Sequence, residues 1–168
     1  MLNSQSLLAP QQLRLAIFIG VIGLLSFGYY LQYFEGLEPC PLCITQRFFL
    51  LLSGSLGLLA LLHNPSVLGT RIYSAIGTLT AAAGAGFASR QLYLQSLPAD
   101  QAPACGPSID FIFQTFSFTD ALSILLRGDG NCAEVVWRFL GLSIPGWTAI
   151  VFSGLALAWL LQLRNSNH

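Results

Sequence analysis

Four long apolar segments alternate with short polar or turn-rich ones along the chain. The first, residues 15–34, contains 20 consecutive residues without a charge, and a helix of that length, about 30 Å, matches the apolar thickness of a bilayer. Comparable apolar segments cover residues 44–62, 72–94 and 145–163. The pattern predicts an all-α membrane protein, a four-helix transmembrane bundle formed by a single domain over residues 1–168.

The ends and the middle of these segments carry further signals. Pro65 follows the second segment and ends its helix, and Pro145 is a favoured first residue for the fourth. Residues 77–86 of the third segment are rich in glycine and alanine, which allow neighbouring helices to approach closely. Trp147 and Trp159 lie towards the two ends of the fourth segment, where we expect them to anchor it at the membrane interfaces.

Composition supports a membrane location. Hydrophobic residues make up 54% of the 168 residues and charged residues only 8%, whereas soluble domains average about 25% charged residues. The formal net charge is zero, and every basic residue is an arginine. The chain therefore lacks the basic surface that a nucleic-acid partner would require.

Charge is divided unequally between the two sides that four spans would create. All seven carboxylates fall in the connections 35–43 and 95–144, whereas the other side carries Arg14, Arg71 and Arg164. Arginine counts alone leave the orientation open, because four arginines lie on the acidic side. Arg14 precedes the first span, and residues 26–38 after it contain no basic residue, which favours cytoplasmic termini.

The long connection over residues 95–144 contains apolar segments of its own. Thr119 is positioned to cap a short helix over residues 121–127, which would end at Gly128. Because these segments are too apolar for a free loop, we expect short helices that lie in the membrane interface.

Four cysteines are the candidate chemical groups. Cys40 and Cys43 form a CxxC motif after the first span, and Cys105 and Cys132 lie between the third and fourth. An even number of spans separates the two pairs, so all four thiols face one compartment, an oxidising one if the termini are cytoplasmic. Four cysteines allow three pairings, and the short CxxC spacing favours Cys40 with Cys43, which leaves Cys105 with Cys132.

The surroundings of the CxxC motif favour reactive thiols. Cys43 lies near the first turn of the second helix, where the helix dipole stabilises a thiolate, and Arg47 follows one turn later. The alternatives are a structural disulfide at either pair, a zinc site, and Arg47 as an interface anchor. A four-cysteine zinc site would normally need a second closely spaced pair. Gln91 and Gln95 either contact a ligand or are simply polar residues at the membrane interface.

Two cysteine pairs in series indicate an electron relay by thiolate attack through mixed disulfides. A soluble thiol protein could reach Cys105 and Cys132 on the long connection. A membrane-dissolved acceptor could reach Cys40 and Cys43 at the mouth of the second span. The natural lipid-soluble acceptor of two electrons is a quinone.

The sequence resembles a known family. The resemblance covers roughly residues 13–163 and rests on the order of the spans and cysteines and on three motifs. These motifs are Glu38-Pro39-Cys40-Pro41-Leu42-Cys43-Ile44-Thr45-Gln46-Arg47, Asn131-Cys132-Ala133-Glu134 and Trp137-Arg138-Phe139-Leu140-Gly141-Leu142-Ser143-Ile144-Pro145-Gly146-Trp147. These features are similar to those of the bacterial disulfide bond formation protein B (DsbB) family. That family implies an inner-membrane thiol oxidase that passes electrons from a periplasmic thioredoxin-fold, DsbA-like protein to ubiquinone or menaquinone.

The resemblance also implies roles for individual residues. Cys105 would form the mixed disulfide with the partner, and Cys132 would be its mate on the loop. Cys43 of the quinone-side pair would lie nearest the ring, and Arg47 would lie beside it. The remaining candidates for quinone binding are Gln46, Gln91 and Gln95. Some members of the family place a histidine near the end of the third span, where this chain has Arg90-Gln91.

Two other classes of protein remain as alternatives. A four-span scaffold would use its disulfides only to shape the outer loop, and its cysteines would never cycle. A related four-helix thiol enzyme, such as a quinone or epoxide reductase, would run electrons in the opposite direction. Turnover of quinone by the purified protein with a reduced DsbA-like partner separates these alternatives.

Overall fold

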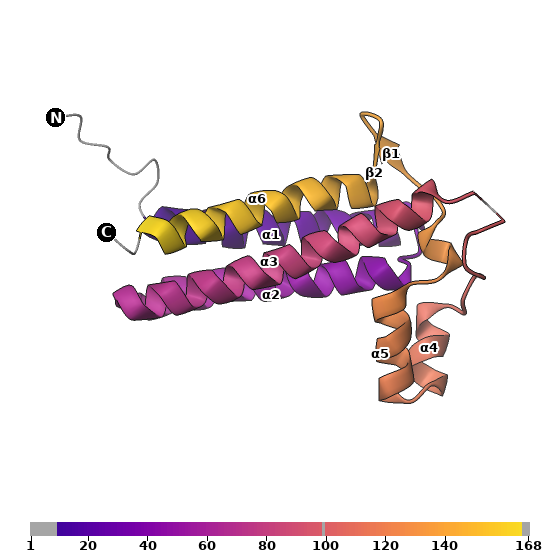
Figure 1. The fold of residues 1–168 in the computed structure, drawn as a ribbon, viewed down its shortest axis with the longest axis horizontal. Helices are drawn as coiled ribbons and strands as arrows, with labels where there is room; N and C mark the ends of the chain where they lie inside the picture. Colours follow the sequence, from indigo (N-terminus) through magenta and orange to yellow (C-terminus); the bar gives the residue numbers. More distant parts are fainter. Residues whose placement is uncertain (1–9, 99, 166–168) are drawn as a thin grey trace.

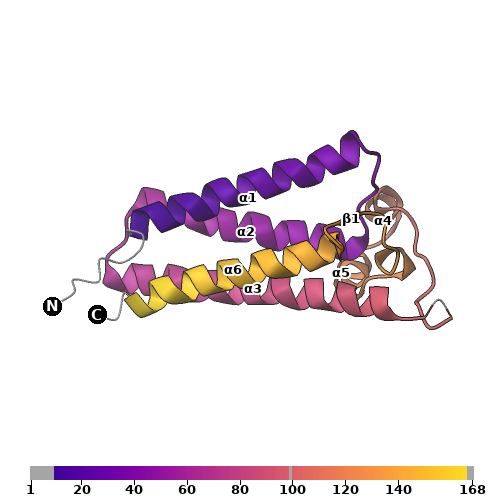
Figure 2. The same ribbon diagram turned by 90° about the horizontal axis from the view of Figure 1, so that it is seen from above.

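Four long helices form the body of the protein in a computed structural model, which describes residues 10–98 and 100–165. They are α1 (Pro10–Tyr33), α2 (Pro41–His63), α3 (Val67–Ser96) and α6 (Ile144–Asn165). The helices lie along one another as a bundle, and the start of α1 and the end of α6 lie at the same end (Figures 1 and 2). Within the described residues, α1, α2 and α6 are long and apolar enough to cross a membrane.

Helix α3 differs from the other three in composition. Its 30 residues would extend about 45 Å, but its many small and hydroxyl side chains make it less apolar than α1, α2 and α6. A Cβ atom built at Gly84 would lie 2.2 Å from the ring of Phe152, and one at Gly77 would lie 2.4 Å from the ring of Trp159. The expected close approach of this segment to a neighbouring helix is confirmed, and the neighbour is α6.

The expectation that Trp159 anchors α6 at an interface is wrong. Its side chain is fully buried and lies against Gly77 of α3. Its indole nitrogen donates a hydrogen bond to Ser53 Oγ of α2 at 3.1 Å. The missing side chain at Gly77 creates the space that the indole fills, so tertiary packing takes precedence over the interfacial preference of tryptophan.

Arg14 of α1 joins all four helices at the end of the bundle where α1 begins. Its side chain is only 2% exposed, and it donates to the carbonyl of Ala60 in α2 at 3.0 Å and to Thr70 Oγ1 in α3 at 2.9 Å. With the Gln162 amide turned to satisfy both groups, its oxygen in α6 accepts from the same guanidinium at 2.7 and 2.9 Å. Buried polar side chains of membrane helices characteristically face the bundle interior in this way.

The connection between α3 and α6 contains α4 (Ile109–Thr115), α5 (Phe118–Arg127), the short 3₁₀ helix η1 (Gly130–Cys132) and a hairpin of β1 (Arg138–Phe139) and β2 (Leu142–Ser143). Helices α4 and α5 project sideways from the bundle, at the end opposite the start of α1 (Figure 1). The prediction that Thr119 caps the helix over 121–127 is wrong, because α5 begins at Phe118 and Ser117 accepts the bond from Asp120 N. Helix α4 and the hairpin were not predicted.

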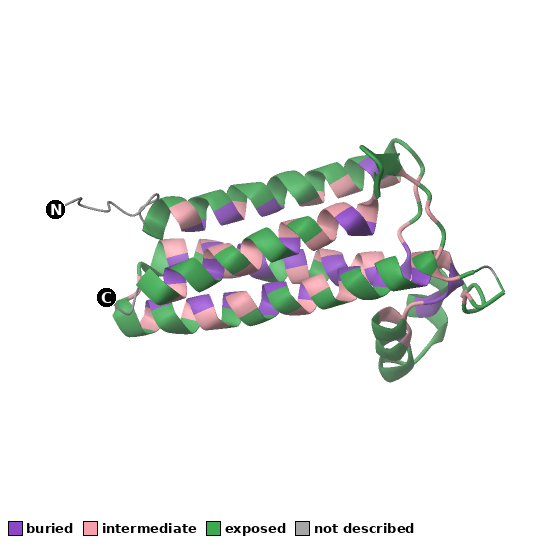
Figure 3. Ribbon diagram, turned by 45° about the horizontal axis from the view of Figure 1, so that its top comes forward, coloured by how far each residue is buried: buried purple, intermediate pink, exposed green. Residues whose placement is uncertain are grey.

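Burial follows the pattern of a bundle with apolar outer faces. The outward sides of the long helices are exposed and the buried residues face one another (Figure 3). Large apolar side chains such as Leu62, Leu68 and Leu79 are among the most exposed. In water such surfaces would be unfavourable, and in a bilayer they face lipid. The structure thus supports a membrane protein.

Candidate thiol site

The CxxC motif lies at the beginning of α2. Cys40 is the residue that precedes the helix, in an extended conformation, and Pro41 is the first helical residue, a position that its fixed φ favours. Cys43 therefore lies in the first turn of α2, as its spacing in the sequence predicts. The sulfur atoms of Cys40 and Cys43 are 2.8 Å apart, which places both at the N-terminus of the helix.

Cys132 reaches the same place from the long connection. Its fully buried side chain packs in a cluster with Cys40, Leu42 and Leu94. A hydrogen bond from the Cys40 thiol lowers the pKa of Cys132. Hydrogen bonding of the single Cys40 proton to its neighbours, Cys132 first and then Cys43, raises the pKa of Cys40, so Cys40 retains this proton. Cys40 is thus the thiol that connects the CxxC motif to the loop.

Cys105 is the exposed cysteine of the four. The backbone on either side of it is bonded to η1: Gly130 N donates to the carbonyl of Ala104 at 3.0 Å, and the Asn131 amide donates to the carbonyl of Gly106 at 3.1 Å. These bonds hold the segment that carries Cys105 against the short helix that carries Cys132. All four cysteines are thiols in the structure, and the pairing of Cys105 with Cys132 stays a prediction.

A cavity of about 550 Å³ opens beside Cys43. Most of its wall is apolar and comes from α1, α2, α6 and the segment that includes β1. The polar lining residues are Glu38, Gln46, Arg47 and Thr148, and the aromatic ones include Phe27, Trp137, Phe139 and Trp147. The cavity is therefore an apolar space with a thiol and a guanidinium on its wall.

Arg47 is held at this cavity by α1. Its guanidinium donates to the carbonyl of Gly28 at 3.0 Å and to Gln32 Oε1, and it lies 5.0 Å from the centre of the Tyr29 ring. These contacts fix the cation beside the cavity that Cys43 also lines. Sequence spacing correctly placed Arg47 one turn after Cys43, but it could not identify the partners on α1.

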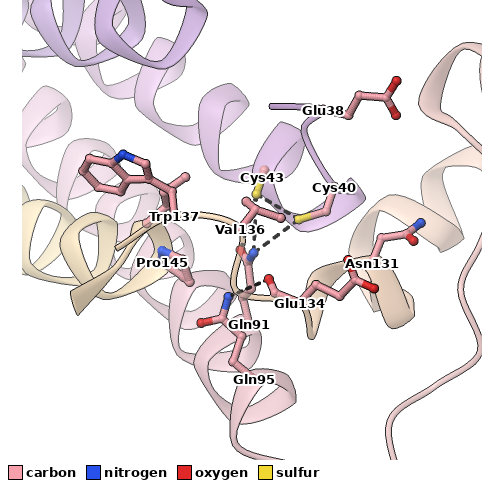
Figure 4. A pocket seen from close by; sticks show the side chains of 11 residues that line it. Glu38, Cys40, Cys43, Gln91, Gln95, Asn131, Glu134, Val136, Trp137 and Pro145 are labelled. Carbon is pink, nitrogen blue, oxygen red and sulfur yellow. Dashed lines mark hydrogen bonds between the residues drawn. The ribbon is translucent and has the colours of Figure 1, made fainter. Parts of the chain in front are cut away.

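Gln91 of α3 contacts the two sulfurs of the motif directly. Its amide nitrogen lies 3.2 Å from Cys40 Sγ and 3.4 Å from Cys43 Sγ (Figure 4). Its amide oxygen accepts from Gln46 Nε2 at 2.7 Å, and Gln46 Oε1 accepts from the hydroxyl of Thr148. Thr148 was not predicted, because a single threonine 102 residues from Gln46 carries no local signal in the sequence.

Gln91 also lines a second, small cavity of about 30 Å³, together with Gln95 and Cys40 (Figure 4). Such a volume holds about one water molecule. Gln95 donates to the carbonyl of Glu134 at 3.3 Å and accepts from Ser143 Oγ at 2.8 Å, so it ties the loop to α3. Neither glutamine lines the large cavity, and their contact with a quinone stays a prediction.

Metal binding was an alternative role for the cysteines. Over residues 10–98 and 100–165, no group of three or more His, Cys, Asp or Glu side chains is placed to hold a metal ion. The contacts that the structure does provide to the sulfurs come from other thiols and from an amide.

Comparison with known proteins agrees with this geometry. The family model described as disulfide bond formation protein DsbB matches residues 10–162. The disulfide bond formation protein B of Hahella chejuensis is 51% identical over 142 residues, which cover 84% of this chain and 86% of the relative. Those of Saccharophagus degradans and Marinobacter nauticus are also 51% identical, over 86% and 88% of this chain and 87% and 88% of the relatives. The chain belongs to the disulfide bond formation protein B family of membrane oxidoreductases.

Proposed function

We propose that the protein is an inner-membrane thiol:quinone oxidoreductase. It reoxidises a periplasmic, thioredoxin-fold DsbA-like dithiol protein and passes the electrons through two cysteine pairs to ubiquinone or menaquinone. The observation that carries the proposal is the order of the sulfurs. Cys105 is exposed, Cys132 and Cys40 are buried in one cluster, and Cys43 lines the large apolar cavity.

The proposed reaction begins on the exposed loop, with Cys105 disulfide-bonded to Cys132. A thiolate of the partner attacks Cys105 Sγ, and Cys132 leaves as a thiolate. The second partner thiol then attacks the mixed disulfide, so the partner leaves oxidised and the loop pair is reduced by two electrons. Cys132 is packed against Cys40, so the thiolate that leaves lies next to the sulfur that it attacks in the following step.

The contact between Cys132 and Cys40 supplies the second step. The Cys132 thiolate attacks Cys40 Sγ of the Cys40–Cys43 disulfide, and Cys43 leaves as a thiolate. Cys105 then attacks Cys132, which restores the loop disulfide and leaves the CxxC pair reduced. Each exchange breaks one disulfide and forms one, so two electrons move from the loop pair to the helix pair.

The large cavity fits a quinone in size and lining. Its volume of about 550 Å³ lies within the range of typical small-molecule sites, roughly 300–1,000 Å³. The apolar and aromatic wall suits a hydrophobic ring, and Arg47 and Gln46 would hold its polar side. A bound quinone would supply an acceptor for two electrons and two protons. Arg47 would stabilise the negative charge that develops beside Cys43.

The same proposal assigns a topology. It has four membrane spans, with α3 as the third, cytoplasmic termini and four periplasmic cysteines. The beginning of α2 and the connection between α3 and α6, which together carry the four cysteines, lie at the end of the bundle opposite the start of α1 (Figure 1), and this supports one shared compartment. Helices α4 and α5 would lie in the interface, since Phe111, Phe113 and Phe118 are exposed apolar side chains.

Turnover by the purified protein tests the function. With a reduced DsbA-like partner and a short-chain quinone, we expect one quinone reduced for each partner oxidised. Cys105→Ser and Cys132→Ser should both stop oxidation of the partner while leaving the CxxC pair able to reduce quinone. Parental rates in either variant would show that the loop pair is structural. Net reduction of the oxidised partner by quinol at equal concentrations would favour the reductase alternative.

A further inference from the structure

A buried chain of hydrogen bonds connects α6 to the reactive sulfurs. It runs from the Thr148 hydroxyl to Gln46 Oε1, from Gln46 Nε2 to Gln91 Oε1, and from Gln91 Nε2 to the sulfurs of the motif. Gln46 and Gln91 are each only 3% exposed. Their amides are therefore shielded from bulk water, and the neighbouring protein groups determine the orientation of each amide.

The direction of this chain follows from the donors and acceptors available. A glutamine amide has one oxygen that accepts and one nitrogen that donates. Because the Thr148 hydroxyl occupies the oxygen of Gln46, the nitrogen of Gln46 faces Gln91. That nitrogen in turn occupies the oxygen of Gln91, so the nitrogen of Gln91 faces the sulfurs. A thiolate accepts such bonds and is stabilised by them.

We propose that Thr148 and Gln46 are positioning residues that set the direction of the Gln91 amide, so that Gln91 donates to the sulfur that carries negative charge during the relay. The inference rests on the proposed function, since only a cycling CxxC pair forms thiolates there. It gives Gln91 the role of stabilising a thiolate. It gives Thr148, which does not react itself, the role of orienting Gln91 through Gln46.

The end of the chain also allows the opposite direction. Thr148 Oγ1 lies 3.1 Å from the carbonyl of Pro145, and its single proton can be given either to that carbonyl or to Gln46. If Pro145 receives it, the hydroxyl oxygen accepts from Gln46, both amides turn, and Gln91 Oε1 faces the sulfurs. It would then occupy the place of the amide nitrogen, which lies 3.2 Å from Cys40 Sγ and 3.4 Å from Cys43 Sγ, and it would accept from a protonated thiol. The chain of hydrogen bonds can thus run in one direction when the cysteine pair holds a thiolate and in the other when the facing sulfur is protonated.

Alkylation of the reduced full-length protein tests this inference. The rate at which iodoacetamide modifies Cys43 is measured by mass spectrometry from pH 6 to pH 10 in wild type and variants. Thr148→Val removes the hydroxyl at nearly constant volume, and we expect a rate at pH 7 that is lower by about three- to tenfold. The plateau at high pH should stay unchanged, because accessibility is unaffected once the thiol is fully ionised.

Three further variants make the test specific. Thr148→Ser should restore the wild-type profile, because it restores the hydroxyl. Thr78→Val is the matched control, since the Thr78 hydroxyl bonds only to Ser74 O of its own helix among the described contacts, and it should leave the profile unchanged. In a Gln91→Met background, adding Thr148→Val should have no further effect, because Thr148 acts through Gln91.

Two results would overturn the inference. One is a Thr148→Val profile identical to wild type at every pH. The other is an equal loss at pH 7 and at the plateau, which would indicate altered access to Cys43 and a merely structural role. The experiment needs neither quinone nor partner protein, so its outcome is separate from that of the turnover assay.

Discussion

Cys40 occupies the N-cap position of α2, where Ser, Thr, Asp and Asn are the preferred residues. Residues that precede a helix commonly accept a hydrogen bond from its first turn, but the side chain of Cys40 makes no such bond. The sulfur instead contacts the other thiols and the Gln91 amide. Pro41 partly compensates, because proline at the first helical position removes one of the first-turn N–H groups that have no partner within the helix. Local helix stability is lowered here in favour of sulfur contacts.

Arg47 is the residue whose substitution should separate the quinone step from the partner step. Its cation is fixed beside the cavity by Gly28 and Gln32, and losing one such preorganised contact commonly costs about 3 kcal/mol, near a hundredfold in rate. We expect Arg47→Gln to slow quinone reduction by about that factor. Arg47→Lys should be intermediate, because it keeps the charge and loses the planar fork.

The control for this prediction is disulfide exchange with the partner. Arg47 is not among the contacts described for Cys105 or Cys132, so formation of the mixed disulfide should proceed at the parental rate in both variants. Quinone reduction is measured at several quinone concentrations alongside it. Normal quinone kinetics in Arg47→Gln would show that Arg47 serves only as an interface anchor.

Residue identity alone was sufficient to find the four cysteines and Arg47, because the CxxC spacing and the single helical turn are local features. It was insufficient for Thr148 and for the partners of Arg47, which come from other helices. It also could not separate Gln91 from Gln95. Only the bundle shows that Gln91 faces the sulfurs while Gln95 bonds to the loop at Glu134 and Ser143.

At the scale of elements, the packing of α3 on α6 depends on missing side chains. Phe152 and Trp159 fill the space left by Gly84 and Gly77, and this lets a helix with few large apolar residues pack tightly. In a membrane, where apolar burial between helices contributes little, such contact is a main source of association.

Gly84→Ala should therefore destabilise the bundle. The added Cβ would lie 2.2 Å from the Phe152 ring, and overpacking of this kind costs about 1–3 kcal/mol. Gly86→Ala on the same helix is the matched control, because nothing lies within 4 Å of its added Cβ. Equilibrium unfolding in mixed detergent micelles measures both. Equal stability of the two variants would contradict the described packing.

The ends of the elements show where sequence reasoning is weakest. Periodicity and prolines located the long helices, but α2 and α3 each begin several residues before their apolar segments do. The cap of α5 was assigned to Thr119 although Ser117 performs it, because two hydroxyl residues lie close together and sequence gives no geometry. Trp159 was misplaced because its partner, Gly77, lies on another helix.

At the scale of the whole molecule, the two ends of the bundle are held by different polar groups. One end has the sulfurs and their amides, and the other has Arg14 with acceptors from three helices. This arginine has a geometric role, because a single side chain fixes the spacing of α1, α2, α3 and α6. It lies far from the chemistry that the sulfurs perform.

Arg14→Leu should weaken the whole bundle without changing the intrinsic reactivity of the thiols. Each buried acceptor left without a donor costs about 1–3 kcal/mol, so a loss of roughly 3 kcal/mol or more in the free energy of unfolding is expected. Arg164→Leu, at an exposed residue near the end of α6, is the control and should change stability little. Unfolding in micelles and alkylation of Cys43 in the folded protein measure the two properties.

The proposed topology makes a prediction for intact cells. After mild reduction, a membrane-impermeant maleimide should label Cys105 from the periplasm, and a small impermeant thiol reagent should reach Cys43 in the same cells. A cysteine introduced at Ser66, which precedes α3 at the other end, should stay unlabelled until the membrane is permeabilised. Labelling of Ser66→Cys in intact cells would contradict the orientation.

Burial of the two middle sulfurs has a consequence for small reductants in the surrounding water. Cys132 is 0% and Cys40 8% exposed, so a dissolved thiol of low molecular weight meets Cys105 and is sterically kept from the sulfurs beyond it. Under the proposed function, a reductant that bypassed the loop would reduce the CxxC pair without any partner protein being oxidised. The protein around Cys132 and Cys40 therefore shields these two sulfurs from dissolved thiols.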